Sequence, residues 1–182
     1  MNYPDNIFLI GFSGSGKSTI GPLLAKELNY DFYDTDSMIE EKAGMGITDI
    51  FVKGGELKFR RLEAAIIEEI IKNITIKKVV ALGGGAFESD HNRELFLKNG
   101  LVIYLKCSAD VIIKRLAISD DRPLLQSISY TNRYEKIKQL LSTREPNYNK
   151  AHMTISALEK NTSKIIATIL QEIKSYNEKN LG

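Results

Sequence analysis

The sequence predicts a single three-layer α/β domain, in which a parallel sheet is covered by helices on both faces. Short apolar runs alternate along the chain with amphipathic segments of helical spacing, which is the pattern of strands joined by crossover helices. The composition, 43% hydrophobic and 26% charged over 182 residues, suits one well-buried globular domain. We therefore expect residues 1–182 to form one domain that binds ligands beyond the carboxyl ends of its strands.

The individual elements follow from the spacing of apolar residues and from turn and capping signals. Ser37 and Glu40 have the Ser-x-x-Glu spacing of a capping box. Pro22 lies inside a helical pattern, where we expect a local distortion or an early turn with unusual hydrogen bonding. The predicted strands are Ile7–Ile10, Asp31–Tyr33, Val79–Leu82, Leu101–Lys106 and Met153–Ile155. The predicted helices include Lys17–Leu28, Gly55–Asn73, Asp90–Asn99, a segment capped by Ser108 that ends at Leu116, Asn132–Ser142 and Thr162–Glu178.

Composition argues against several classes of protein. The formal charge is only +2, and the basic doublets, which include Arg60-Arg61 and Lys77-Lys78, are scattered along the chain, so we expect no nucleic-acid partner. No apolar run is long enough to span a bilayer, and the first residues lack the pattern of a secretory signal. The single Cys107 excludes an internal disulfide. These features predict a cytoplasmic monomer without membrane association.

The strongest motif is the segment Gly11–Ser18, which fits the phosphate-loop pattern G-x-x-x-x-G-K-[S/T] in full. A predicted strand precedes it and a predicted helix follows it, as the motif requires. Its glycines allow backbone N–H groups to point at phosphate oxygens, and the helix N-terminus adds partial positive charge. Lys17 would reach the β- and γ-phosphates, and the Ser18 hydroxyl would ligate Mg²⁺. The segment predicts nucleotide binding without specifying a reaction.

Other residues favour a small-molecule kinase over a switch protein. The chain has no Asn-Lys-x-Asp element for reading guanine. Asp34-Thr35-Asp36 follows a predicted strand, and in extended chain the two carboxylates would point the same way, one toward the metal and one toward an acceptor hydroxyl. The alternative is that both are ordinary turn and helix-start residues.

Gly83-Gly84-Gly85 follows another predicted strand, where exposed backbone N–H groups would let an anionic substrate approach. A tight structural turn is the competing interpretation. Arg60 lies near the start of the long predicted helix, where it can pair with Glu63 or Glu56, and a solvated helix face is the alternative there.

Two further arginines lie late in the chain. Arg122-Pro123 lies in the turn-rich segment 117–131, which we interpret as a mobile lid whose arginine stabilises the transferring phosphoryl group. An ordinary surface loop is the alternative. Arg144-Glu145-Pro146 is equally consistent with a helix C-terminal signal.

Taken together, these residues resemble those of the shikimate kinases, a branch of the P-loop kinases with the nucleoside-monophosphate-kinase fold. The resemblance extends from Ile7 to the last predicted helix. It implies a five-stranded parallel sheet in the order 2-3-1-4-5. It also implies transfer of phosphate from ATP, with Mg²⁺, to the 3-hydroxyl of shikimate, a step of aromatic amino acid biosynthesis. It rests on the phosphate loop, Asp34-Thr35-Asp36, Phe59-Arg60 with Glu63, Gly83-Gly84-Gly85, Arg122-Pro123-Leu124, and Arg144 with Pro146 and Tyr148.

The resemblance also implies roles for individual residues. Lys17 and Arg122 would hold the transferring phosphate, and Ser18 and Asp34 would serve the metal. Arg115 matches a position that lies against adenine. The residues implied to bind ATP are therefore Gly14, Ser15, Gly16, Lys17, Ser18, Thr19, Arg115 and Arg122.

For the acceptor, the implied binding segment is about 34–63 together with later residues. Asp36 would bind the shikimate hydroxyls and is the candidate base, and Glu63 would steady Arg60. A planar guanidinium suits a carboxylate better than an ammonium group does. The residues implied to bind the ring carboxylate are Arg60, Arg144, Gly84 and Gly85.

The sequence departs from the family at Pro22, where arginine is common, and Asp120-Asp121 precedes Arg122 in the predicted lid. Gluconate kinase is the alternative enzyme, although the second acid of Asp34-Thr35-Asp36 and the positions of the arginines argue against it. A nucleotide-dependent binding module without activity is the alternative from another class. Such a module would be expected to lack Lys17, Asp34 or Arg122, and all three are present.

Overall fold

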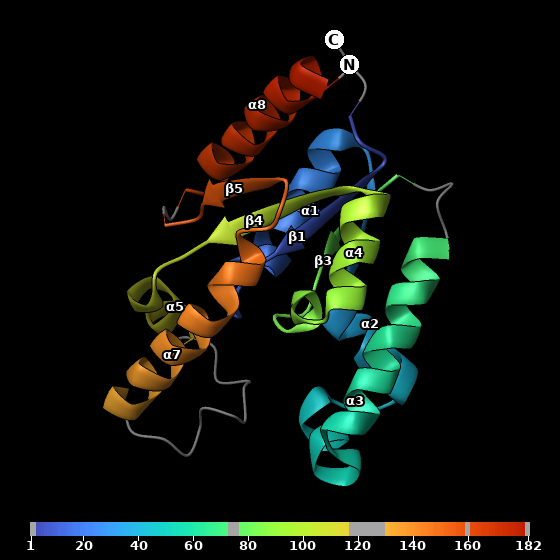
Figure 1. Ribbon diagram of the computed structural model, residues 1–182, viewed down its shortest axis with the longest axis vertical. Coiled ribbons are helices and arrows are strands. Elements are labelled where there is room, and N and C mark those ends of the chain that lie inside the picture. The colour runs from blue at the N-terminus through green and yellow to red at the C-terminus, as the bar shows by residue number, and fades with distance from the viewer. Residues whose placement is uncertain (1–2, 73–76, 117–129, 159–160, 181–182) are drawn as a thin grey trace.

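A computed structural model describes residues 3–72, 77–116, 130–158 and 161–180 of the chain. Its centre is a five-stranded sheet in the order β2-β3-β1-β4-β5, and every neighbouring pair is parallel (Figure 1). Both the predicted three-layer α/β class and the strand order implied by the resemblance are confirmed. The strands are β1 (Asn6–Ile10), β2 (Asp31–Asp34), β3 (Lys78–Ala81), β4 (Leu101–Lys106) and β5 (Met153–Ser156).

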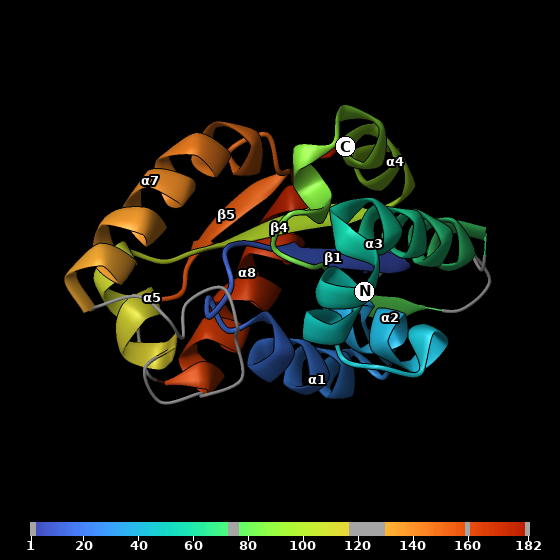
Figure 2. The same ribbon diagram turned by 90° about the horizontal axis from the view of Figure 1, so that it is seen from below.

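The helices lie on both faces of this sheet (Figure 2). Most predicted helices are confirmed, with ends that differ by a few residues. In the described part of the chain, no helix is both long and apolar enough to cross a membrane. The helices are α1 (Lys17–Leu28), α2 (Thr35–Ala43), α3 (Ile47–Lys72), α4 (Asp90–Asn99), α5 (Ala109–Leu116), α7 (Tyr130–Tyr148) and α8 (Thr162–Asn180), with a short 3₁₀ turn, η1 (Ala86–Glu88).

The central strand shows why the sheet needs cover on both sides. Ile7 and Leu9 of β1 belong to one buried cluster, whereas Phe8 and Ile10 belong to the other, because successive side chains point to opposite faces. The first cluster is completed by residues of α1, α5 and α8, and the second by residues of α2, α3 and α4. All four of these β1 side chains are at most 1% exposed. The fully apolar run at Ile7–Ile10 is therefore a strand buried on both faces.

Three predicted boundaries differ from the ends of the observed elements, each for a physical reason. Ser37 does not cap a helix, because α2 begins earlier, at Thr35, with Asp34 as its N-cap; the Asp34 side chain accepts a hydrogen bond from the Asp36 N–H at 3.0 Å. The helix α3 begins at Ile47, but Gly55 has a non-helical backbone (φ 66°, ψ −177°) that glycine adopts readily and forms a kink between two helical segments, so the predicted start at Gly55 matches the second segment.

The third difference is at the end of α7. The predicted helix ends at Ser142, and a C-terminal signal is one interpretation of Arg144-Glu145-Pro146, but α7 continues through Pro146 to Tyr148. Tyr148 is only 1% exposed and packs against Tyr104 of β4, with ring centroids 5.1 Å apart. Burial of this ring outweighs the loss of one helical hydrogen bond at the proline.

The expected distortion at Pro22 is not seen, since α1 continues through it without interruption. Gly21, just before it, is buried against Phe32, where a Cβ atom would lie 2.3 Å from the ring. The restriction that proline places on the preceding residue comes partly from that residue's Cβ, which glycine lacks. The Gly21-Pro22 pair is therefore compatible with a helix packed tightly on β2.

Candidate active site

The carboxyl ends of three adjacent strands assemble the candidate site. In the order β2-β3-β1, these strands lead into Asp34, the glycine turn Gly83-Gly84-Gly85 and the phosphate loop Gly11–Ser18, respectively. Segments far apart in the sequence therefore meet at one edge of the sheet, as expected for ligand sites in parallel α/β domains.

The phosphate loop has the backbone that its glycines predict. Gly14 and Gly16 have φ values of 81° and 106°, in the region that favours glycine. The Lys17 ammonium lies over the loop and donates to the Gly11 and Phe12 carbonyls at 2.8 and 3.1 Å. Because α1 begins at Lys17, its first N–H groups open onto the loop. The loop thus combines backbone donors with a fixed cation.

Ser18 and Asp34 form a polar contact between this loop and β2. The Ser18 hydroxyl donates to Asp34 Oδ2 at 2.6 Å, and the other carboxylate oxygen of Asp34 caps α2. These are hard oxygen donors on an exposed serine and a half-buried aspartate, the donor type that Mg²⁺ prefers. The pair predicted to serve a metal is therefore brought together.

Asp36 points elsewhere. Since Asp36 lies in the first turn of α2, the expectation that it would point the same way as Asp34 along an extended chain is wrong. Its carboxylate lies against the glycine turn, where a Cβ on Gly83 would be 2.5 Å from Oδ1. Between the two acids, the buried Thr35 accepts a hydrogen bond from the Gly83 N–H at 2.8 Å. Asp34 thus faces the phosphate loop, and Asp36 faces the glycine turn.

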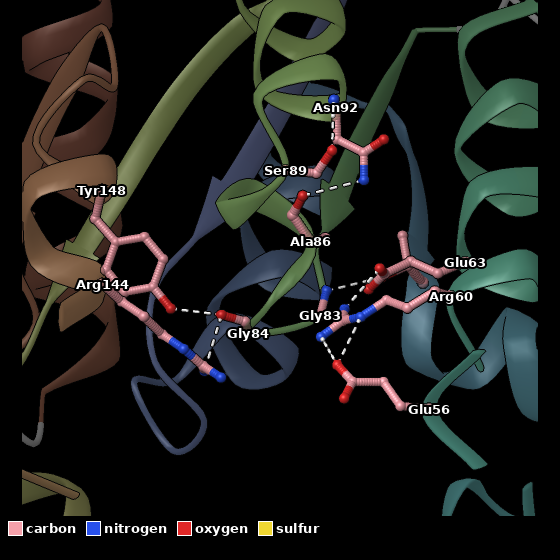
Figure 3. A network of polar contacts seen from close by, with 11 residues as sticks. Glu56, Arg60, Glu63, Gly83, Gly84, Ala86, Ser89, Asn92, Arg144 and Tyr148 are labelled. Carbon is pink, nitrogen blue, oxygen red and sulfur yellow. Dashed lines mark hydrogen bonds and ion pairs between the residues drawn. The ribbon is translucent and has the colours of Figure 1, made fainter. Parts of the chain in front are cut away.

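Arg60 lies on one side of the glycine turn (Figure 3). Its guanidinium donates to Glu63 at 2.8 Å and to Glu56 at 3.2 and 3.3 Å, so both predicted pairings occur together. A Cβ on Gly85 would lie 3.2 Å from both terminal nitrogens of Arg60. Glu63 is 3% exposed; burial raises its pKa, and the hydrogen bond from Arg60 opposes that shift.

Arg144 lies on the other side of the same turn (Figure 3). It donates to the Gly84 carbonyl at 3.2 Å, and its guanidinium carbon is 5.5 Å from the centre of the Phe12 ring. A Cβ on Gly84 would lie 3.4 Å from the Ser13 nitrogen and 3.6 Å from Arg144. These contacts at Gly84 are of ordinary van der Waals length, whereas a Cβ on Gly85 would crowd Arg60, so it is Gly85 whose lack of a side chain favours the close approach of an arginine.

Arg115 is placed behind the phosphate loop. It donates to the Ser15 carbonyl at 3.0 Å, to the Gly14 carbonyl at 3.4 Å and to the Ala157 carbonyl after β5 at 2.9 Å. These contacts hold the planar guanidinium next to the phosphate-binding segment. Arg122 and residues 117–129 of the predicted lid lie outside the described residues.

Sequence reasoning missed two side chains that shape the site. Thr35 was treated only as the spacer between two aspartates, and Tyr148 only as part of a family pattern. Neither has a local signal, because each acts through a hydrogen bond to a distant backbone group: Gly83 for Thr35 and Gly84 for Tyr148.

The phosphate loop, the two aspartates and the arginine-flanked glycine turn, placed on this sheet, define a small-molecule kinase of the P-loop class. Comparison with known proteins narrows this class. The sequence model of the shikimate kinase family matches residues 13–174. The chain belongs to the shikimate kinase family.

Individual relatives are similar along nearly the whole chain. A shikimate kinase of Chlorobium phaeobacteroides (strain DSM 266) is 40% identical, over 100% of this chain and 97% of its own length. One from a Sulfurihydrogenibium species is 45% identical, over 93% of this chain and 98% of the relative. The solved structure of the Acinetobacter baumannii shikimate kinase in complex with shikimate has a TM-score of 0.86 and 37% identity, with 93% of each chain covered. A gluconokinase from Sinorhizobium meliloti shares the fold at 18% identity and a TM-score of 0.63.

Proposed function

We propose that this protein transfers the γ-phosphate of ATP to the 3-hydroxyl of shikimate, giving shikimate 3-phosphate and ADP. The observation that carries the proposal is the placement of Arg60 and Arg144 on opposite sides of one glycine turn, next to a complete phosphate loop. Two guanidinium groups beside a half-buried backbone turn suit a planar carboxylate, and the adjacent loop suits the phosphates of a nucleotide.

The nucleotide half of the proposal rests on the phosphate loop. Residues 14–19 would surround the phosphates with backbone N–H groups, and Lys17 would place its charge on the transferring group. The fixed guanidinium of Arg115, beside the loop, would lie against adenine. For Arg122, the proposed contact with the transferring phosphate rests on the sequence.

The proposed metal is Mg²⁺, held by Ser18 directly and by Asp34 through water. The 2.6 Å contact between their oxygens shows that both donors reach one point beside the phosphate loop. When bound, Mg²⁺ neutralises charge on the β- and γ-phosphates. Asp34 also caps α2, so its carboxylate is held in place through its other oxygen.

The acceptor half orients shikimate. Arg60, Arg144 and the backbone of Gly84 and Gly85 would bind the ring carboxylate, and this directs the remote 3-hydroxyl toward the phosphate loop. Asp36 would accept the hydroxyl proton as the oxygen bonds to the γ-phosphorus and the bond to the bridging oxygen of ADP breaks. Because phosphoryl transfer depends mostly on positioning, we expect Asp36 to act as much by orienting the hydroxyl as by removing its proton.

A coupled assay of ADP release tests the proposal. Wild-type protein would be compared across shikimate, gluconate and adenylate, with Mg²⁺ present and then removed by a chelator. Lys17→Ala protein, purified in the same way, controls for contaminating kinases. We expect turnover that requires both shikimate and Mg²⁺. Phosphorylation of gluconate as fast as that of shikimate would contradict the proposed function. A monomeric state and a cytoplasmic location stay predictions from the sequence.

A further inference from the structure

Gly84 offers its carbonyl to two donors from the same helix. Residues 144 and 148 lie one turn apart on α7, so their side chains leave the helix on one face. The Tyr148 hydroxyl donates to the Gly84 oxygen at 2.5 Å, and Arg144 donates to the same oxygen at 3.2 Å (Figure 3). The tyrosine contact is the shorter one, although the arginine carries the charge.

We propose that Tyr148 is a positioning residue for Arg144, because it holds the Gly84 carbonyl and so leaves Arg144 able to turn to the substrate carboxylate. This inference rests on the proposed function and goes beyond it, since Tyr148 itself contacts no substrate. A carbonyl oxygen has two lone pairs, and both are used here. When Arg144 leaves, the oxygen keeps its tyrosine partner.

The energetic argument concerns the carbonyl that Arg144 leaves. A buried acceptor without a partner is costly, and a substrate that closes the site removes the water that would otherwise replace Arg144. Without the Tyr148 hydroxyl, Arg144 would be the remaining side-chain donor to Gly84 among the described residues. Arg144 would then stay hydrogen-bonded to the Gly84 carbonyl instead of turning to the substrate carboxylate.

Two further observations support Tyr148 in this role. Its ring is 1% exposed and packs against Tyr104, so the hydroxyl is held in one place. Burial raises the pKa of Tyr148 to about 12, so the hydroxyl remains protonated and a donor at neutral pH. Arg144, by contrast, forms no ion pair with an acidic side chain in the described part of the chain, which leaves its charge for an anionic ligand.

A contact from the same end of α7 to η1, just after the glycine turn, provides a matched control. Asn147 donates to Glu88 at 3.1 Å and so also ties the end of α7 to η1, without touching Gly84. Asn147→Ala therefore removes this hydrogen bond between α7 and η1 while keeping the Tyr148 hydroxyl. Tyr148→Phe keeps the ring and removes the hydroxyl.

The experiment measures the affinities for shikimate and ATP by calorimetry for both variants, alone and combined with Arg144→Ala. For Tyr148→Phe we expect the Kd for shikimate to rise roughly five- to tenfold, the loss of about one hydrogen bond, with the Kd for ATP unchanged. In the Arg144→Ala background, Tyr148→Phe should have no further effect on shikimate affinity. Asn147→Ala should bind shikimate like the wild type.

Three results would overturn the inference: wild-type shikimate affinity in Tyr148→Phe, the same loss with or without Arg144, or an equal loss in Asn147→Ala. Should Tyr148→Phe not fold, a crystal structure of the wild type with shikimate decides. Arg144 should then have left Gly84 while Tyr148 remains on it, and the reverse would refute the proposal. If the wild type neither binds nor phosphorylates shikimate, the proposed function itself is refuted. A failure of the Tyr148 inference alone would leave shikimate binding and phosphorylation by the wild type intact, so the two outcomes are distinguishable.

Discussion

The nucleotide half and the acceptor half of the site are built in different ways. The nucleotide half is centred on one continuous segment, Gly11–Ser18, whose backbone and single lysine would do most of the binding under the proposed function. The acceptor half takes one residue or turn from each of several separate elements, with Asp36 on α2, Arg60 on α3, the glycine turn after β3, and Arg144 on α7. One half is thus encoded locally, and the other exists only once the sheet has formed.

The two arginines of the acceptor half also differ from each other. Arg60 is held by two carboxylates of its own helix, and one of them, Glu63, is buried. Arg144 reaches across from α7 to a neutral carbonyl and the face of Phe12. The first arrangement fixes a guanidinium in advance, and the second leaves one that can change partners. A fixed guanidinium and a movable one, on opposite sides of a turn, can together bind a carboxylate that enters from solvent.

The largest expected effect is in the nucleotide half. Lys17→Ala removes the fixed positive charge from the transferring phosphate, so kcat should fall roughly a hundredfold or more, or about 3 kcal/mol of transition-state stabilisation. Shikimate affinity should stay near that of the wild type. Lys26→Ala, an exposed lysine of the same helix, is the control in steady-state assays. Near-normal kcat in folded Lys17→Ala would contradict the role.

Asp36 should affect chemistry more than binding. Asp36→Asn keeps the size of the side chain but removes the charge that accepts the hydroxyl proton. We expect single-turnover rates to fall by roughly a hundredfold, the low end for a general base, with a smaller change in the Kd for shikimate. Asp31→Asn, at the exposed start of β2, is the matched control. An unimpaired single-turnover rate would eliminate Asp36 as the base.

Arg60 should show the opposite pattern. Arg60→Lys keeps the charge but loses the planar two-pronged contact, so shikimate binding should weaken by about 1.5–3 kcal/mol. ATP affinity should scarcely change. Arg61→Lys, the exposed neighbour, provides the control in calorimetry. Unchanged shikimate affinity in Arg60→Lys would show that Arg60 does not bind the substrate carboxylate, and the proposed difference between the two arginines would no longer hold.

The smallest effect should lie outside both halves, at His152. Its Nδ1 accepts the Val102 N–H at 3.0 Å, and burial lowers the pKa of His152. The folded state therefore binds the proton less readily than the unfolded state. Stability should be complete above the unfolded pKa of about 6.5 and should decrease as pH falls through it toward the lower folded pKa.

Urea unfolding at pH 7.5 and pH 5.5 measures this dependence. Protein with His152→Gln should lose that part of the pH dependence, while His91→Gln, at an exposed position, should keep it. A pH dependence identical in all three proteins would assign the effect to other groups.

Local signals explain how much of this molecule the sequence predicts. The strand at Ile7–Ile10 and the phosphate loop depend on neighbouring residues alone, and both are confirmed in the structure. The helical continuation through Pro146 depends on the packing of Tyr148 against Tyr104, which are distant in the chain. The same holds for the contacts of Thr35 and Tyr148, whose partners lie 48 and 64 residues away in the chain. Residue types could be predicted, but their orientation could not.

The central claim is that the acceptor half recognises shikimate by its ring carboxylate. The most direct test compares the kcat/KM of the wild-type protein for shikimate and for the neutral carboxamide of shikimate, at saturating ATP and Mg²⁺. The carboxamide keeps the ring and every hydroxyl but removes the charge that the two arginines bind. We predict that kcat/KM falls by roughly tenfold to a hundredfold, the range for losing charge-assisted hydrogen bonds. Equal kcat/KM values for the two compounds would contradict the account.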